Sequence, residues 1–231
     1  MPHGIVRMMT VVLAAVAAPR ADTLFSDDFG DGDADGWFEI SQIEYQVEEG
    51  MYWFHGGYEE NQGISYSGDS AGFMSVPDYS ARCRMIIDTG YFIGLFVRFR
   101  EDAPYNLMLL LCPPEQKLML YSWHWTGVTL LDWEPYPVEY DEEHWMRFEV
   151  QGAEFRGKAW QGGTGDEPTF WMVSAFDSTV SLPGSVGLFC VGLQGGDVSL
   201  SGRFDDVCVT DPAPTLLESS TWGSIKSVAA P

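Results

Sequence analysis

Apolar and polar residues alternate along much of the chain, most clearly between residues 144 and 160. Residues 146–150 alternate apolar with charged side chains, which is the period-two pattern of a strand with one buried face. A second alternating run, residues 154–160, follows the pair Gln151-Gly152. The two runs predict a β-hairpin on one surface of a layered β structure.

Other strand-like runs are separated by turn residues. The run at 91–100 is apolar on both faces until Arg98 and Arg100, which predicts a central strand. No stretch before Pro212 has the three-to-four-residue apolar period of a helix. Many short strands joined by turns predict an antiparallel β-sandwich. The remaining predicted strands are Thr23–Phe29, Tyr45–Phe54, Ile64–Tyr66, Gly72–Val76, Ser80–Asp88, Tyr105–Cys112, Lys117–Trp125, Val128–Trp133, Ser185–Leu193 and Val198–Thr210.

The N-terminal residues have the composition of an export signal. Arg7 precedes an apolar run at residues 8–18, and small residues surround the expected cleavage after Ala17. The run is too short to span a membrane, so residues 1–17 predict a secretory signal peptide. We expect a protein that is secreted, periplasmic or on the cell surface.

The C-terminal residues differ from the body of the chain. A proline-containing linker follows residue 211, so we expect one domain at residues 22–211 and a tail at 212–231. An apolar Trp222 beside a flexible linker is typical of a docking element for a partner protein. Disordered termini are common, which is the alternative interpretation.

The formal net charge of -22 limits the kinds of molecule that the protein is expected to bind. Such a field repels phosphate backbones and anionic lipid, which argues against a nucleic-acid partner. Cations, neutral sugars and basic protein surfaces remain compatible. The acidic surface also has a plain alternative role, because net charge keeps a secreted protein soluble.

Four cysteines are spread one to a strand-like segment: Cys83, Cys112, Cys190 and Cys208. In an oxidising compartment they are able to form two disulfides, with three possible connectivities. Buried free thiols are the alternative. The ligand spacing of a zinc site is missing from the sequence.

Several segments together resemble secreted bacterial laminin-G-like domains of the concanavalin A-like lectin/glucanase superfamily. They are LFSDDFGDGDADGW, HWMRFEVQGAEFRGKAW, EPTFWMVSAFD, GSVGLFCVG and GRFDDVCVT, and the resemblance covers most of residues 23–211. It implies an all-β, two-sheet antiparallel jelly-roll sandwich whose first and last strands lie close together. The superfamily contains both carbohydrate-binding modules and glycosidases, so the fold leaves the activity open.

The acidic run Asp31-Gly-Asp33-Ala-Asp35-Gly36 is a candidate calcium site. Calcium prefers several oxygen ligands from a flexible loop. An EF-hand is excluded, because Gln42 stands where that loop needs a glutamate. We expect a structural Ca²⁺ site, completed by Asp28 and, if the terminal strands pair as the resemblance implies, by Asp205 or Asp206. The alternative is a solvated acidic turn.

The run Lys117–Trp125 is the candidate ligand surface. Leu118 and Leu120 share one face, which we expect to lie in the core. Aromatic rings on the opposite face suit the apolar faces of sugars. The predicted carbohydrate-binding residues are Tyr121, Trp123 and Trp125, with Arg98 as a hydrogen-bond donor. Rings covered by loops or by the second sheet are the alternative.

Glu139, Asp141 and Glu143 match the E-x-D-x-E pattern of glucanases in this superfamily. A retaining mechanism needs its two carboxyl groups roughly 5 Å apart on one strand face. Pro135 and Pro137 lie just upstream, which predicts a loop here instead of a strand.

The sequence therefore predicts a non-catalytic, calcium-stabilised β-sandwich that binds carbohydrate or another extracellular ligand. One alternative is a glycoside hydrolase acting on a β-glucan-like polysaccharide. The other is a structural or interaction protein of the cell envelope.

Overall fold

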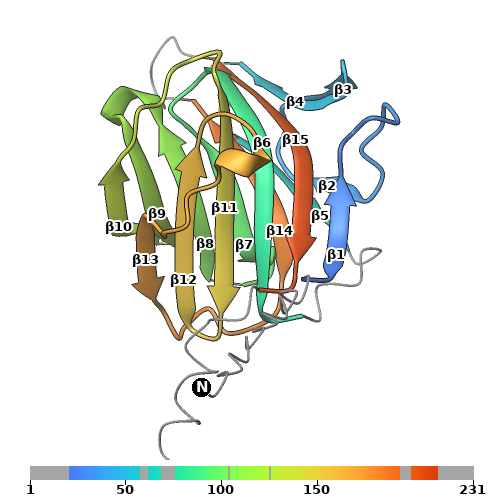
Figure 1. Ribbon diagram of the computed structural model, residues 1–231. Helices are drawn as coiled ribbons and strands as arrows, with labels where there is room; N and C mark the ends of the chain where they lie inside the picture. The colour runs from blue at the N-terminus through green and yellow to red at the C-terminus, as the bar shows by residue number, and fades with distance from the viewer. Residues whose placement is uncertain are drawn as a thin grey trace, which may run out of the picture.

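Two antiparallel β-sheets packed face to face form the protein (Figure 1). The computed structural model describes residues 21–57, 62–68, 76–103, 105–124, 126–192 and 199–212. The described residues contain no α-helix and two short 3₁₀ turns, η3 (Pro113–Glu115) and η4 (Thr164–Asp166). The predicted two-sheet jelly-roll sandwich is confirmed.

The eight-stranded sheet contains both ends of the described chain. Its strands follow the order β13 (Val173–Phe176), β12 (Glu154–Trp160), β11 (Glu143–Gln151), β6 (Tyr79–Thr89), β15 (Leu200–Thr210), β4 (Met51–Gly56) and β3 (Glu44–Glu48), and β1 (Thr23–Asp27) also pairs with β15. The seven-stranded sheet follows the order β10 (Gly127–Pro135), β9 (Lys117–His124), β8 (Tyr105–Cys112), β7 (Phe92–Phe99), β14 (Ser185–Val191), β5 (Gln62–Ser67) and β2 (Trp37–Glu39).

The predicted hairpin is β11 and β12, paired from Trp145 opposite Trp160 to Gln151 opposite Glu154. Gly152 forms its turn with a φ of 59°, a left-handed conformation that costs glycine little. The alternate apolar residues of both strands are buried between the sheets. The predicted central strand is confirmed as well, because β7 lies between β8 and β14.

The core lies between the two sheets and is filled by every second residue of most strands. Leu109 of β8 fits against Gly157 of β12, where an added Cβ would lie 2.5 Å from the leucine methyl groups. The sheets are therefore in close contact at this point, and each buried leucine contributes about 1.5–3 kcal/mol.

The first and last strands pair, as the resemblance implied. Asp27 of β1 stands opposite Val207 of β15 in this ladder. The loop that follows β1 therefore lies beside the middle of β15, far away in sequence.

Two short edge strands, β2 and β13, are absent from the sequence-based prediction. Each has few residues, which gives little alternation to detect. The predicted strand Gly72–Val76 falls almost wholly outside the described residues. The predicted signal peptide and the Trp222 tail lie outside them too, and both stay predictions.

All four cysteines are free in the structure, and Cys83, Cys112 and Cys190 are buried. Burial raises the pKa of the Cys83 and Cys190 thiols. The structure thus has the free thiols that were the alternative to the predicted disulfides. No helix in the described part of the chain has the length and apolar content needed to cross a membrane.

The buried His144 is expected to destabilise the fold at acidic pH. It is fully buried, its Nδ1 lies 3.1 Å from the Tyr136 hydroxyl, and burial lowers its pKa below the ordinary value of about 6.5. As the pH falls below about 6.5, His144 therefore becomes protonated in the unfolded chain but stays neutral in the folded protein. Below this pH, we expect His144 to lower the free energy of unfolding by up to about 1.4 kcal/mol for each unit by which the pH falls. Urea titrations from pH 7 to 5 measure this slope.

His144→Gln is the matched variant, since its amide keeps a hydrogen-bonding group for Tyr136 without titrating. The free energy of unfolding of this variant should change less with pH than that of the parent protein between pH 7 and 5. Identical slopes for both proteins would contradict the assignment to His144.

Candidate functional site

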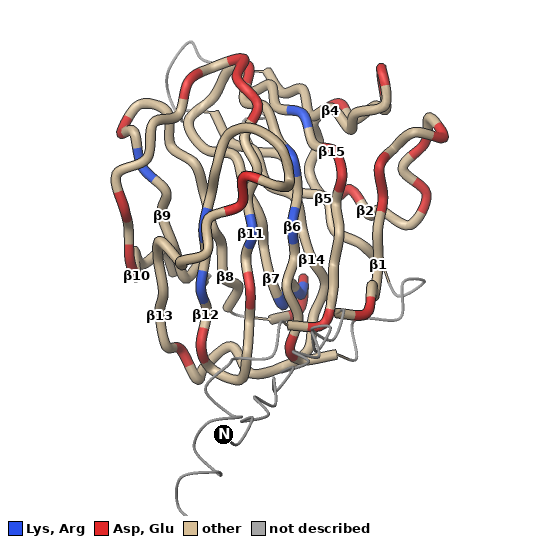
Figure 2. The backbone as a smooth tube through the Cα atoms, in the orientation of Figure 1, with Lys and Arg blue, Asp and Glu red and all other residues tan. Residues whose placement is uncertain are grey.

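The outward faces of the two sheets differ in chemistry. The outer face of the eight-stranded sheet carries six cations, visible as blue segments on β6, β11, β12 and β15 in Figure 2. Five of them pair with carboxylates, for example Arg147 with Glu167 at 2.6 Å. This face is therefore largely neutralised by its own ion pairs. The six cations are Arg82, Arg84, Arg147, Arg156, Lys158 and Arg203.

The outer face of the seven-stranded sheet is apolar. On β8, Leu107, Leu109 and Leu111 enter the core, so Met108 and Leu110 point outward. Neighbouring strands repeat this pattern and form a second hydrophobic cluster that also contains aromatic rings. The cluster consists of Ile64, Phe96, Phe99, Met108, Leu110 and Phe189, with Tyr66, Phe92, Tyr121, Trp123 and Val191 packed against it.

A hollow of about 220 Å³ opens on this face, and we call it the apolar hollow. Apart from the indole N–H of Trp123, Gln62 and Tyr121 supply its only polar side-chain groups among the described residues. The Tyr121 hydroxyl lies 3.7 Å from the Met119 sulfur, and burial raises its pKa. The other lining residues are Phe92, Phe96, Met108, Leu110, Trp123, Val128, Phe189 and Val191.

A second hollow, of about 460 Å³, lies beside it, and we call it the polar hollow. Trp123 lines both hollows, so its ring lies between them. The polar hollow adds Arg100 and Glu101 to an apolar floor of Ile40, Ile64 and Phe99.

The charged groups of the polar hollow are held in place. Glu101 accepts a 3.0 Å hydrogen bond from the Tyr66 hydroxyl. Arg100 donates two hydrogen bonds, of 2.9 and 2.8 Å, to the carboxylate of Asp102. This bidentate pair fixes the guanidinium and offsets its charge.

Two predicted ligand residues face the hollows. Leu118 and Leu120 are fully buried in the core, and Tyr121 and Trp123 lie on the opposite face as predicted. Trp125 falls outside the described residues. The ligand-binding role of all three aromatic residues stays a prediction.

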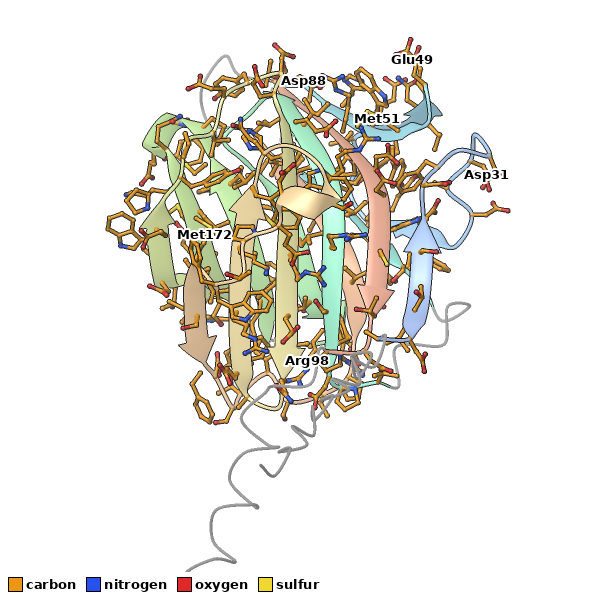
Figure 3. All side chains as sticks on the ribbon, viewed as in Figure 1. Asp31, Glu49, Met51, Asp88, Arg98 and Met172 are labelled. Carbon is orange, nitrogen blue, oxygen red and sulfur yellow. The ribbon has the colours of Figure 1, made fainter. Side chains whose placement is uncertain are left out.

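Arg98, the fourth predicted ligand residue, lies elsewhere. It is 2% exposed at the lower end of the sandwich in Figure 3. Its guanidinium donates to the carbonyl oxygens of Pro77 and Val180 and to the Asp78 carboxylate, at 2.5–2.9 Å. All three nitrogens are thus engaged in the interior, and the predicted contact with ligand is corrected to a structural role.

A β-bulge explains the difference. Phe96 pairs with Gly187 and Phe99 with Ser185, so β7 has one residue more than β14 over this span. Arg98 takes a φ of 50° within it. One extra residue reverses the faces of everything that follows, which turns Phe99 outward and Arg98 inward. Sequence reasoning did not assign Arg100 and Glu101 to the ligand surface. Both follow the end of β7 at Phe99, where the two-residue alternation no longer predicts which way a side chain points.

The glucanase-like carboxylates are not brought onto one strand face. Glu139 and Asp141 precede β11, and Asp141 has a left-handed φ of 60°. Only Glu143 belongs to the strand, where it pairs with Arg84 at 2.8 Å. It lies on the outer face of the eight-stranded sheet, on the opposite side of the sandwich from both hollows.

The acidic loop after β1 is only partly assembled as predicted. Asp28, Asp31 and Asp206 line one hollow of about 360 Å³, and Figure 3 shows Asp31 in the loop beside β1. Asp206 is also paired with Arg84 at 3.1 Å.

The carboxylates within the predicted calcium loop also stabilise tight turns. Asp31 accepts a hydrogen bond from the backbone of Asp33, and Asp33 accepts one from the backbone of Asp35. No three Asp, Glu, His or Cys residues of the described chain are close enough together to hold a metal ion. The arrangement fits the solvated-turn interpretation without an ion, and calcium binding stays a prediction.

Solved structures share this architecture. The carbohydrate-binding module CBM66 from Bacillus subtilis is 14% identical, with a TM-score of 0.59 over 76% of this chain and 96% of the module. SCLam, an endo-β-1,3(4)-glucanase of family GH16, is 9% identical, with a TM-score of 0.57 over 85% of this chain and 93% of the enzyme. A xylan β-1,4-xylosidase from Bacillus halodurans is 12% identical, with a TM-score of 0.59 over 86% of this chain and 41% of the enzyme.

At these identities the likeness shows the fold, which carries both binding modules and enzymes. No protein-family model and no curated protein sequence matches the chain.

A calcium titration tests the acidic loop. If Ca²⁺ binds at Asp28, Asp31 and Asp206, a hundredfold excess over the dissociation constant should raise the melting temperature by roughly 5–10 °C, and a chelator should reverse the rise. Asp31→Asn keeps the turn-forming oxygen but removes the charge, so it should abolish the shift. Asp177→Asn, in another exposed turn, should retain it. A melting temperature that changes with neither Ca²⁺ nor chelator would rule out a calcium site in this loop.

Proposed function

We propose that the protein is a secreted, non-catalytic carbohydrate-binding β-sandwich and that the ligand lies over Trp123 on the outer face of the seven-stranded sheet. The observation that carries this proposal is the meeting of a half-buried indole with Arg100 and Glu101 around one open hollow. The predicted signal peptide agrees with an extracellular ligand.

The chemistry of the polar hollow suits a sugar ring. The apolar face of a pyranose packs on a flat aromatic ring, and its hydroxyls need fixed hydrogen-bonding groups at the edge. Glu101 offers carboxylate oxygens to hydroxyl donors, and Arg100 offers guanidinium N–H groups to hydroxyl oxygens. Hydrogen bonds to charged groups contribute about 1.5–3 kcal/mol each.

The surrounding charge favours a neutral sugar over an acidic one. The chain has a formal net charge of -22, and Asp102 already engages the guanidinium of Arg100. A uronate or sulfate group would approach this acidic surface against a repulsive field.

The carbohydrate-binding module CBM66 supports a binding role, because this chain matches nearly its full length. The GH16 enzyme shares the fold too, but of the three residues that match the glucanase pattern only Glu143 lies in a strand here, and it stands on the opposite sheet from the hollows. We therefore propose binding without hydrolysis. The laminin-G-like resemblance and structural calcium belong to the same proposal.

Removing the indole of Trp123 tests the proposal. Trp123→Ala should weaken retention on immobilised or gel-embedded polysaccharides about tenfold, because the sugar loses its stacking surface. Affinity electrophoresis against a panel of neutral polysaccharides measures the retention.

Trp53→Ala is the matched control, since Trp53 is also half-buried but lies on the eight-stranded sheet. It should bind like the parent protein. Unchanged circular dichroism would show that both variants fold. Full retention by folded Trp123→Ala, or equal losses in the two variants, would contradict the proposed surface.

A further inference from the structure

The apolar hollow differs from a sugar site in its chemistry, and the following inference rests on the proposed function. Its walls are hydrocarbon and aromatic rings apart from Gln62, Tyr121 and the Trp123 indole N–H. A sugar hydroxyl placed among these walls would leave water and find few partners, at a cost of about 1–3 kcal/mol each. The glycan ring therefore belongs in the polar hollow, and the apolar hollow needs a different occupant.

The size and wall geometry indicate what that occupant is. An apolar protein cavity of roughly 150 Å³ accommodates one benzene molecule, and this hollow measures about 220 Å³. Phe96 and Phe189 meet edge to face at 5.3 Å and 72°, and Phe92 and Tyr121 do so at 6.0 Å and 72°. Such walls favour another aromatic ring, because edges and faces of rings attract one another.

The hollow is also largely preformed. Phe96, Met108, Leu110 and Phe189 are almost completely buried, so their rotamers are fixed by packing before any ligand arrives. Preorganised walls lose little conformational entropy on binding. A short aromatic group gains this benefit fully, whereas a long alkyl chain would extend beyond the hollow.

We propose that the ligand is an aryl-substituted glycan or aryl glycoside. Its sugar occupies the polar hollow against Arg100 and Glu101, and its aryl group occupies the apolar hollow. Trp123 forms a wall of both hollows, so a substituent attached directly to the sugar reaches from one to the other.

Matched glycosides test this assignment. Isothermal titration of the full chain compares phenyl with methyl glycosides of glucose, xylose, galactose and mannose. For the sugar that binds, the phenyl glycoside should bind at least tenfold more tightly than the methyl glycoside. Phenol alone should bind more weakly than the phenyl glycoside, since it lacks the contacts of the polar hollow.

Two variants separate the hollows. Val128 lines the rim of the apolar hollow and is 57% exposed, so Val128→Asp should keep the fold and remove the phenyl advantage. Thr129→Asp adds the same charge on the next residue, which points to the other face of β10, and should leave that advantage intact. Glu101→Gln should weaken methyl and phenyl glycosides by the same factor.

The outcomes distinguish the two proposals. Equal affinities for methyl and phenyl glycosides would overturn the aryl assignment while the carbohydrate site stands. Phenol binding as tightly as phenyl glycosides would overturn it as well, because the sugar in the polar hollow would then add nothing to the affinity. Failure of all glycosides and polysaccharides to bind would overturn the proposed function itself.

Discussion

The buried guanidinium of Arg98 makes the contacts on which the shape of the outer face of the seven-stranded sheet depends. It joins the two sheets by donating to Pro77 and Val180 carbonyl oxygens, and its charge is balanced by Asp78. It also lies 5.4 Å from the ring centre of Phe155, in the opposite sheet. The guanidinium is buried while Asp78 is partly exposed, so loss of these contacts would leave a buried charge without partners and destabilise the bulge of β7.

The bulge links the interior to the surface. Because it reverses the faces of the strand, Phe99 joins the outer hydrophobic cluster and forms part of the floor of the polar hollow. A regular strand would place Arg98 outside, and the hollow would have a different floor. The outward position of Phe99 in the floor of the polar hollow therefore goes together with the burial of Arg98.

The two outer faces of the sandwich differ in the side chains that they expose. The eight-stranded face pairs five of its six cations with acids on neighbouring strands or in the loop that contains Glu167, which leaves few unpaired charges on this surface. The seven-stranded face leaves aromatic and aliphatic side chains accessible around two hollows. An apolar surface next to fixed polar groups is the usual composition of a ligand site, which is why we propose that the ligand binds on this face.

The sequence by itself determined most of the strands, the faces of the hairpin and the outward direction of Tyr121 and Trp123, because these follow from a two-residue period that is local. It also determined the acidic character that argues against nucleic acid. Only the tertiary structure decided where Arg98 lies, because a single extra residue in β7 shifts the period and Arg98 makes its contacts with residues that are distant in sequence. Strand order likewise decided that Gln62, Trp123 and Phe189 share one hollow, and that Glu143 stands on the other sheet. Alternation tells which residues face the same way, but pairing between remote strands decides which of them meet.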